Sequence, residues 1–134
     1  MDDVARTKPI IAVLEDHDDT RELLRLTLGV EFSVQEFRNA PDLLAALERE
    51  EFSAVVADIM LPGVDGFSFI EVVRSDDRFK DLCVVAVTAL AMQTDRDKAM
   101  KAGFTDYLTK PIAPSQIASV LRKHIKRRVV TKDH

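Results

Sequence analysis

The sequence lacks the features that cross-link a chain or place it in a membrane. It contains one cysteine, Cys83, which excludes an intramolecular disulfide and is typical of a protein in a reducing cytoplasm. No apolar run approaches the roughly eighteen residues that a transmembrane helix requires. The N-terminus is acidic and has no apolar core, which is not the pattern of a secretory signal. We therefore expect a cytoplasmic protein with no membrane partner.

Aromatic residues are scarce, at 6% of the chain, and none lies among the basic residues near the C-terminus. Sites for single-stranded nucleic acid combine basic residues with aromatic rings on which the bases stack. Basic residues in the last turns of a helix instead complement the helix dipole. We therefore expect no direct binding of nucleic acid, despite the cluster of Arg122, Lys123, Lys126, Arg127, Arg128 and Lys132.

At 134 residues the chain has room for one domain. We expect an N-terminal tail over residues 1–8, a single domain over residues 9–128 and a C-terminal tail over residues 129–134. Within the domain, apolar runs of strand length alternate five times with segments of helical periodicity. This alternation predicts an α/β fold of the doubly wound (βα)5 type, with a five-stranded parallel sheet and helices on both faces.

The expected strands cover residues 9–14, 32–37, 54–57, 82–87 and 107–109. The second of them alternates polar and apolar residues, which is typical of a half-exposed edge strand. The first helix is expected to begin at Thr20, with Asp18, Asp19 or Thr20 as its cap. The fourth helix is expected over residues 93–102, with Gly103 ending it.

Asp58 follows the expected strand of residues 54–57, which is apolar throughout and therefore buried on both faces. The turn-forming residues Pro62 and Gly63 come soon after it. In an open parallel sheet, ligands bind in the crevice outside the carboxyl ends of the strands. Asp58 is thus a candidate site residue, although an aspartate at such a position also serves simply to open a loop.

Polar residues also end three other expected strands: Glu15 and Asp16 the first, Thr88 the fourth and Lys110 the fifth. In a parallel sheet all of them meet Asp58 at one edge. Three crowded carboxylates keep their charge by binding a cation, and oxygen ligands favour Mg²⁺. The lysine adds a mobile positive charge, and the threonine adds a hydroxyl donor. The predicted pocket fits a phosphoryl group, with Asp58 as the nucleophile.

The same residues resemble the motifs of the receiver domain of two-component response regulators, in order and from about residue 9 to residue 126. The matching segments are ED at residues 15–16, DIMLPG at 58–63, TA at 88–89 and YLTKP at 107–111. The resemblance implies a flavodoxin-like sheet of strand order 2-1-3-4-5. It implies that Asp58 takes a phosphoryl group from a phosphohistidine of a histidine kinase or a histidine phosphotransfer protein. The chain would then catalyse only its own phosphorylation and dephosphorylation, and would not be an enzyme in the usual sense.

The resemblance further implies a Mg²⁺ site. The residues implied for it are Asp16, Asp58, the backbone carbonyl of Met60 and, largely through a metal-bound water, Glu15. The Lys110–Pro111 peptide bond is implied to be cis. His17 is expected to be an exposed residue of the helix cap rather than a ligand, because Mg²⁺ prefers oxygen.

A switch is implied as well. Thr88 would move toward the phosphoryl group, and Tyr107 would turn from an exposed to a buried rotamer. This rearrangement would change a surface within residues 91–128 that binds a downstream protein. A phosphorylation-dependent homodimer is a second possible outcome of the switch. The alternative for Tyr107 is a half-buried aromatic residue whose hydroxyl lies in water. Candidates either for the partner surface or for helix packing are Met92, Met100 and Phe104.

Two apolar residues, Met60 and Leu90, stand two positions beyond Asp58 and Thr88. Neither side chain orients an attacking water, so we expect a long-lived acyl phosphate. A Mg²⁺-dependent phosphatase with an aspartate nucleophile would need a second aspartate where Met60 stands.

Two binding functions are the remaining alternatives. A flavodoxin-like nucleotide-binding module would need a first loop that cradles phosphate, whereas the acidic residues 15–19 repel one. A receiver-like interaction module that is never phosphorylated is the other alternative. We expect either a stand-alone receiver or a piece of a hybrid histidine kinase or longer regulator.

Overall fold

The computed structural model describes residues 8–60 and 66–132 of the chain. Over these ranges, five parallel strands form one sheet in the order β2-β1-β3-β4-β5, which confirms the predicted fold and strand order. The strands are β1 (Ile10–Leu14), β2 (Ser33–Phe37), β3 (Ala54–Asp58), β4 (Cys83–Thr88) and β5 (Asp106–Thr109). The helices are α2 (Asp18–Leu28), α3 (Ala40–Arg49), α4 (Gly66–Ser75), the 3₁₀ helix η1 (Asp77–Phe79), α5 (Gln93–Ala102) and α6 (Pro114–Lys132).

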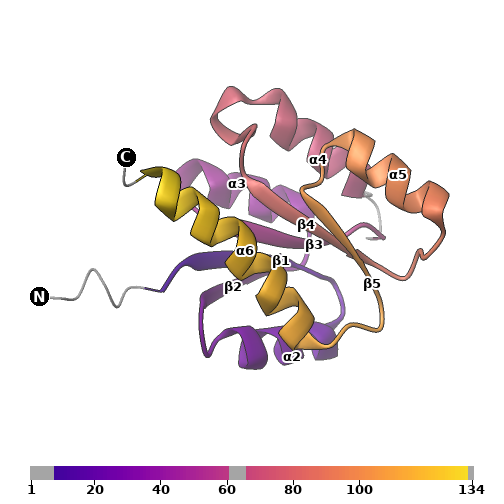
Figure 1. The fold of residues 1–134 in the computed structure, drawn as a ribbon, viewed down its shortest axis with the longest axis horizontal. Coiled ribbons are helices and arrows are strands. Elements are labelled where there is room, and N and C mark those ends of the chain that lie inside the picture. Colours follow the sequence, from indigo (N-terminus) through magenta and orange to yellow (C-terminus); the bar gives the residue numbers. More distant parts are fainter. Residues whose placement is uncertain (1–7, 61–65, 133–134) are drawn as a thin grey trace, which may run out of the picture.

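Helices cover both faces of the sheet (Figure 1). On one face, Leu28 of α2 and Leu121 of α6 pack with alternate residues of the central strands. On the other face, Leu43 of α3, Phe69 of α4 and Ala99 of α5 do the same. β3 and β4 are buried along their whole length because both of their sides are covered, as their uninterrupted apolar sequences predicted.

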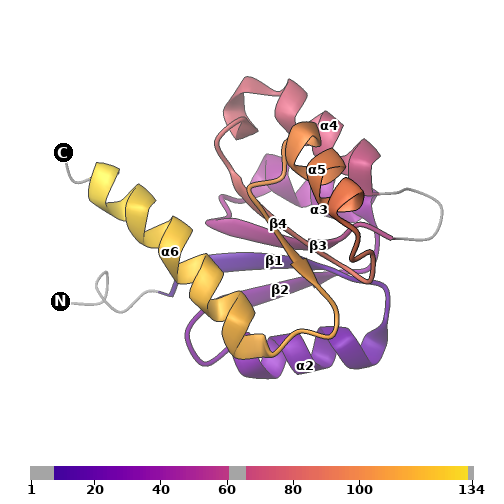
Figure 2. The same ribbon diagram turned by 45° about the vertical axis from the view of Figure 1, so that its right-hand side comes forward.

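The edge strand β2 keeps only exposed and half-buried residues, which confirms the edge position that its alternation predicted. The last helix, α6, continues to Lys132, past residue 128. The described chain starts and finishes on the side of the sheet where the strands begin, and the carboxyl ends of the strands lie on the opposite side (Figure 2). No helix within the described ranges is long and apolar enough to cross a bilayer.

The start of α2 differs from the prediction. The helix begins at Asp18, its N-cap residue is His17, and no side chain caps it, so a start at Thr20 with an aspartate or threonine cap was wrong. The reason is that the Asp18 carboxylate accepts a hydrogen bond of 2.6 Å from Arg21 one turn later. Asp18 and Asp19 therefore occupy the first turn, where negative charge is favourable next to the positive end of the helix dipole.

Two glycines hold backbone positions that other residues would not fit. Gly103 ends α5 with φ at 121°, which confirms it as the C-terminal cap. Gly66 opens α4, and a Cβ there would lie 2.6 Å from Cα of Ile59. Its N–H also donates to the Ile59 carbonyl, at 2.7 Å. The turn predicted at Pro62 and Gly63 lies outside the described residues.

The candidates for a partner surface divide into two groups. Phe104 is buried and stacks edge-on against Phe67, so it serves helix packing. Met92 and Met100 are exposed by 69% and 40%. Of the three candidates, Met92 and Met100 are therefore the ones available to a partner.

Candidate functional site

The pairing of the strands brings the predicted site residues to one edge of the sheet. Leu14 of β1 lies opposite Ala57 of β3, so the residues that follow, Glu15 and Asp58, are neighbours. On the other side of β3, Asp58 lies opposite Val87 of β4. The next residue, Thr88, ends β4 and accepts a 2.7 Å hydrogen bond from the backbone N–H of Lys110 at its carbonyl.

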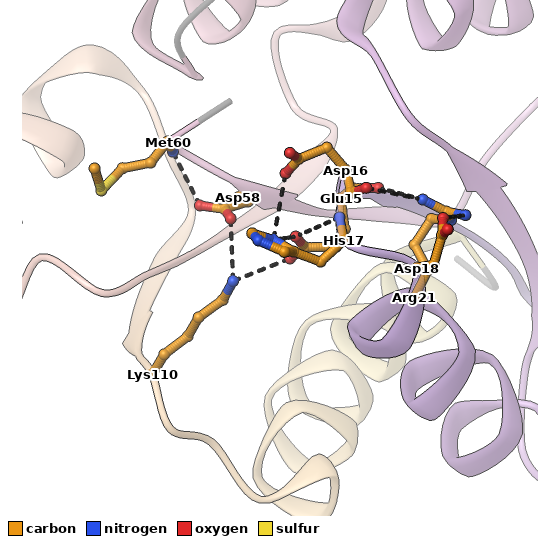
Figure 3. Close-up of polar contacts among 8 residues, drawn as sticks. All are labelled: Glu15, Asp16, His17, Asp18, Arg21, Asp58, Met60 and Lys110. Carbon is orange, nitrogen blue, oxygen red and sulfur yellow. Dashed lines mark hydrogen bonds and ion pairs between the residues drawn. The ribbon is translucent and has the colours of Figure 1, made fainter. Parts of the chain in front are cut away.

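Lys110 joins two carboxylates that are far apart in the sequence (Figure 3). Its Nζ lies 3.0 Å from Oδ2 of Asp58 and 3.1 Å from Oε1 of Glu15. Both carboxylates are almost completely buried, with side chains 5% and 3% exposed, whereas the lysine is 27% exposed. The Lys110–Pro111 peptide bond is cis, as expected. The predicted convergence of Glu15, Asp58 and Lys110 is therefore present in the structure.

The two carboxylates have different electrostatic surroundings. Burial raises the pKa of Asp58, and hydrogen bonds from Met60 and Lys110 only partly offset this effect. Burial acts in the same direction on Glu15, but hydrogen bonds from His17 and Lys110 outweigh it and lower the pKa of Glu15. Burial disfavours the charge of Lys110, yet its hydrogen bonds to both acids raise its pKa overall. Of the two acids, Asp58 has the less stabilised negative charge, which suits a nucleophile.

Asp16 is oriented differently from Glu15. Its Oδ1 is buried and has no hydrogen-bond partner among the described residues, although Nδ1 of His17 lies 3.5 Å away. A buried carboxylate oxygen without a partner is costly unless a cation or water satisfies it. The carboxylates of Glu15 and Asp16 have oxygens within 4.8 Å of each other, which gives an oxygen-rich donor set of the kind that hard divalent cations bind. The residues present therefore fit a magnesium ion.

Met60 and Thr88 complete the surroundings of Asp58. The backbone N–H of Met60 donates to Oδ1 of Asp58 at 2.9 Å, while its side chain is 54% exposed. Thr88 is fully buried, and its Oγ1 accepts a 3.2 Å hydrogen bond from the N–H of Leu90 rather than contacting Asp58. Thr88 thus lies at the same edge and is joined to Lys110 through the backbone, while its hydroxyl makes none of the hydrogen bonds to Asp58 found among the described residues.

Comparison with known proteins identifies this arrangement. The family model of the response regulator receiver domain matches residues 11–122, which is most of the chain. The chain belongs to this family. It is therefore a receiver domain of the type found in two-component response regulators, a signalling module.

Relatives of known sequence agree with this assignment. The uncharacterized 14.6 kDa protein of the sodA1 3′ region of Leptolyngbya boryana is 38% identical over 115 residues, which cover 85% of this chain and 88% of that protein. Response regulator Rre1 of Synechocystis is 30% identical over 92% of this chain but only 54% of its own length. Transcriptional regulatory protein GltR of Pseudomonas aeruginosa is 32% identical over 91% of this chain and 51% of its own length. The receiver thus spans about half the length of the last two proteins.

Solved structures show the same fold. A sensor protein from Polaromonas superposes with a TM-score of 0.81 at 30% identity, over 89% of this chain and 97% of that one. The receiver domain of the sensor histidine kinase PA1611 from Pseudomonas aeruginosa has a TM-score of 0.81 at 26% identity, over 90% of this chain and 99% of that one. That domain contains a magnesium ion coordinated in its active-site cleft.

Tyr107 of the receiver is in a buried rotamer. Its side chain is 3% exposed, and its hydroxyl donates a hydrogen bond to the carbonyl of Leu90. Arg96 of α5 lies over the ring, 5.8 Å from its centroid, and donates to the Tyr107 carbonyl. The alternative that the hydroxyl lies in water was therefore wrong.

Two residues of the receiver site were not predicted from the sequence. Arg21 is buried, and its guanidinium donates to the backbone carbonyls of Glu15 and Asp16, at 3.2 and 3.3 Å. It thereby fixes the loop that carries both acids. His17 was expected in the cap region, where it is 70% exposed, but its contact with Glu15 was not expected. The signal available for Arg21 was its place one turn beyond the acidic loop, on the face of α2 that also buries Leu24 and Leu28.

Proposed function

We propose that this receiver is the phosphoacceptor of a two-component system or phosphorelay, and that Asp58 is the residue phosphorylated. The donor is a phosphohistidine on a histidine kinase or a histidine phosphotransfer protein. An oxygen of the Asp58 carboxylate attacks the phosphorus, the phosphorus–nitrogen bond breaks and the imidazole leaves. The observation that carries this proposal is the bridge from Lys110 to the buried carboxylates of Asp58 and Glu15.

Each residue of the pocket has a part in this reaction. The N–H of Met60 and the ammonium of Lys110 orient the two oxygens of Asp58. The lysine also neutralises charge on the oxygens of the incoming phosphoryl group. Mg²⁺, when bound, neutralises further charge on the same oxygens. The residues that would hold it are Asp16, Asp58, the backbone carbonyl of Met60 and, through a water, Glu15.

The proposal includes the signal that leaves the receiver. Movement of Thr88 toward the phosphoryl group favours the buried rotamer of Tyr107 and changes a surface within residues 91–128 that binds a downstream protein. Met92 and Met100 are exposed on this surface. A phosphorylation-dependent homodimer would use the same surface. A cytoplasmic location is part of the proposal and agrees with the buried thiol of Cys83.

Intact mass spectrometry tests the phosphoacceptor role. The protein is incubated with Mg²⁺ and acetyl phosphate, which supplies a phosphoryl group without a kinase. We expect the wild type to gain the mass of one phosphoryl group and Asp58→Asn to gain nothing. Asp77→Asn, a change on the exposed surface of η1, is the matched control and should behave like the wild type. A gain in Asp58→Asn, or none in the wild type, would overturn the proposal.

The same preparation separates the receiver from a phosphatase. A phosphatase would release product from an unrelated ester such as p-nitrophenyl phosphate over many turnovers. We expect no such turnover, because the exposed thioether of Met60 stands where a general acid would be needed. Repeated turnover that depends on Asp58 would favour the phosphatase instead.

Tyrosine fluorescence tests the switch. The chain has one tyrosine and no tryptophan, so its emission reports on Tyr107 alone. The structure holds the buried rotamer, and the proposed switch requires that the unphosphorylated protein also populates an exposed one. We therefore expect acetyl phosphate and Mg²⁺ to increase the protection of Tyr107 from quenching by acrylamide in the wild type but not in Thr88→Ala. Equal protection with and without acetyl phosphate in the wild type would exclude this residue as a switch.

A further inference from the structure

His17 lies beside the two acids of the first loop and has no part in the function proposed above. Its Nδ1 is 3.0 Å from Oε2 of Glu15 and 3.5 Å from Oδ1 of Asp16 (Figure 3). One donor atom from each of the three residues lies within 4.8 Å of the other two. A nitrogen donor is therefore placed next to the oxygens that fit a divalent cation.

The position of His17 in the chain does not account for this orientation. It is the N-cap residue of α2, but its side chain makes no capping hydrogen bond. The ring lies against Glu15, whose Oε2 also accepts a 3.2 Å hydrogen bond from the His17 backbone N–H. At 70% exposure, the imidazole remains accessible to a cation from solution.

We propose that His17 supplies an imidazole ligand to the cation site of this receiver. The site consequently binds borderline divalent transition metal ions, such as Co²⁺ or Ni²⁺, with a stronger preference over Mg²⁺ than an all-oxygen site would have. The inference rests on the proposed function, because it uses the same acidic pocket. Imidazole is a good ligand for such ions, whereas Mg²⁺ prefers oxygen and gains little from it.

The spacing of the donor atoms supports the inference. Two ligands on adjacent corners of an octahedron lie about 3 Å apart when each is about 2.1 Å from the metal. The separations of Nδ1 from the oxygens of Glu15 and Asp16 are 3.0 and 3.5 Å, so small side-chain rotations bring the three atoms to this geometry. The Asp16 oxygen in this set is the buried one that has no hydrogen-bond partner among the described residues.

Calorimetric titration of the full chain with Co²⁺ and, separately, with Mg²⁺ tests the selectivity. Because Co²⁺ binds most mixed sites more tightly than Mg²⁺, the informative quantity is the effect of His17→Gln on each ion. We expect this change to weaken Co²⁺ binding by about tenfold or more and to leave Mg²⁺ binding within about twofold. His124→Gln is the matched control, because His124 lies on α6 near Asp106, and it should change neither affinity.

Pulsed electron paramagnetic resonance of bound Mn²⁺ tests the ligand directly. We expect a coupling to a histidine nitrogen in the wild type and in His124→Gln, and its loss in His17→Gln. If His17 only orients Glu15, the wild type shows no nitrogen coupling and His17→Gln weakens both metals alike, which would overturn the inference.

These results also separate the two proposals. Phosphorylation of Asp58 with Mg²⁺, combined with unchanged Co²⁺ affinity in His17→Gln, would refute the ligand role and leave the phosphoacceptor role intact. A nitrogen coupling without any phosphorylation would do the reverse. Absence of all metal binding would refute both.

Discussion

The two ends of the strands, the carboxyl edge and the amino edge of the sheet, differ in how their charged side chains are paired. At the carboxyl edge, the acids Glu15, Asp16 and Asp58 crowd around one cation, Lys110, and an oxygen of Asp16 has no partner among the described residues. At the amino edge of β4 and β5, the partly buried cation Arg74 donates hydrogen bonds to backbone carbonyls.

Arg74 satisfies acceptors from three segments of the chain. Its guanidinium donates to the carbonyls of Gly103 and Phe79, both at 2.8 Å, and to Oγ1 of Thr105 at 3.3 Å. The same Oγ1 accepts from the N–H of Val84 at the start of β4. Burial lowers the pKa of Arg74, but its hydrogen bonds keep the charge well solvated by the protein. The amino edge thus joins the helices to the sheet, whereas the carboxyl edge keeps an excess of negative charge.

The largest expected effect concerns Lys110 at the carboxyl edge. Lys110→Met should slow phosphorylation of Asp58 by acetyl phosphate by about 100-fold or more, because it removes the charge that faces the phosphoryl oxygens. Lys80→Met, at the exposed end of η1, is the matched change at the amino edge and should leave the rate unchanged. The rates are measured by intact mass against time. Similar rates in both variants would mean that the two edges do not differ in this way.

The amino edge should instead control stability. Arg74→Met is expected to lower the free energy of unfolding by about 2–3 kcal/mol, because it leaves the carbonyls of Gly103 and Phe79 without their donor. Urea unfolding provides the measurement, with the exposed Arg49→Met as control. The rate of phosphorylation of the folded protein should stay that of the wild type. A loss of stability no larger than that of Arg49→Met would show that the hydrogen bonds of Arg74 contribute little to the free energy of unfolding.

A smaller effect is expected from the exposed side chain beside Asp58. Met60→Asn should shorten the lifetime of the acyl phosphate by about tenfold, or about 1.4 kcal/mol, because an amide orients an attacking water and a thioether does not. Decay is followed by intact mass after removal of acetyl phosphate. Val72→Asn, which replaces an apolar side chain that is 51% exposed on α4, is the control. Equal lifetimes in wild type and Met60→Asn would reject the expectation of a long-lived acyl phosphate.

The smallest effect contrasts the two acids that share Lys110. Because burial raises the pKa of Asp58, its ionised form opposes folding, and Asp58→Asn should stabilise the protein by about 1 kcal/mol at neutral pH. This gain should vanish as the pH falls through the folded-state pKa, because the wild-type carboxyl then takes up a proton. The pKa of Glu15 is lowered, so its ionised form favours folding and Glu15→Gln should destabilise the protein at neutral pH. The difference in stability between this variant and the wild type should shrink as the pH falls through the folded-state pKa of Glu15. Urea unfolding across this pH range measures both, and the same sign for both variants would contradict the electrostatic contrast.

The sequence predicted the parts of this molecule that depend on pattern. Apolar runs located the strands, and the polar residues that end them located the site, because parallel strands bring their carboxyl ends to one edge. The convergence of Lys110, Asp58 and Glu15 at one edge followed from that placement, whereas the hydrogen bonds from Lys110 to both carboxylates are seen only in the structure. The roles of Arg74 and Arg21 did not, because each depends on acceptors that only the folded chain brings together.

Side-chain orientation was also beyond the sequence. The sequence left two alternatives for Tyr107, a buried rotamer or a half-buried ring with its hydroxyl in water. The hydrogen bond from the hydroxyl to the Leu90 carbonyl decides between them for this structure. The start of α2 was misplaced because Asp18, a residue type that often caps helices, is paired with Arg21 instead. Local preference was thus overruled by a contact one turn away.

The described chain starts and finishes on the side of the sheet opposite the carboxyl ends of the strands, which has a practical consequence (Figure 2). A fluorescent protein, an affinity tag or a second domain attached beyond either limit of the described chain is joined on the far side of the sheet from the proposed phosphorylation site. One fused protein or tag can therefore be exchanged for another without changing residues at the carboxyl edge.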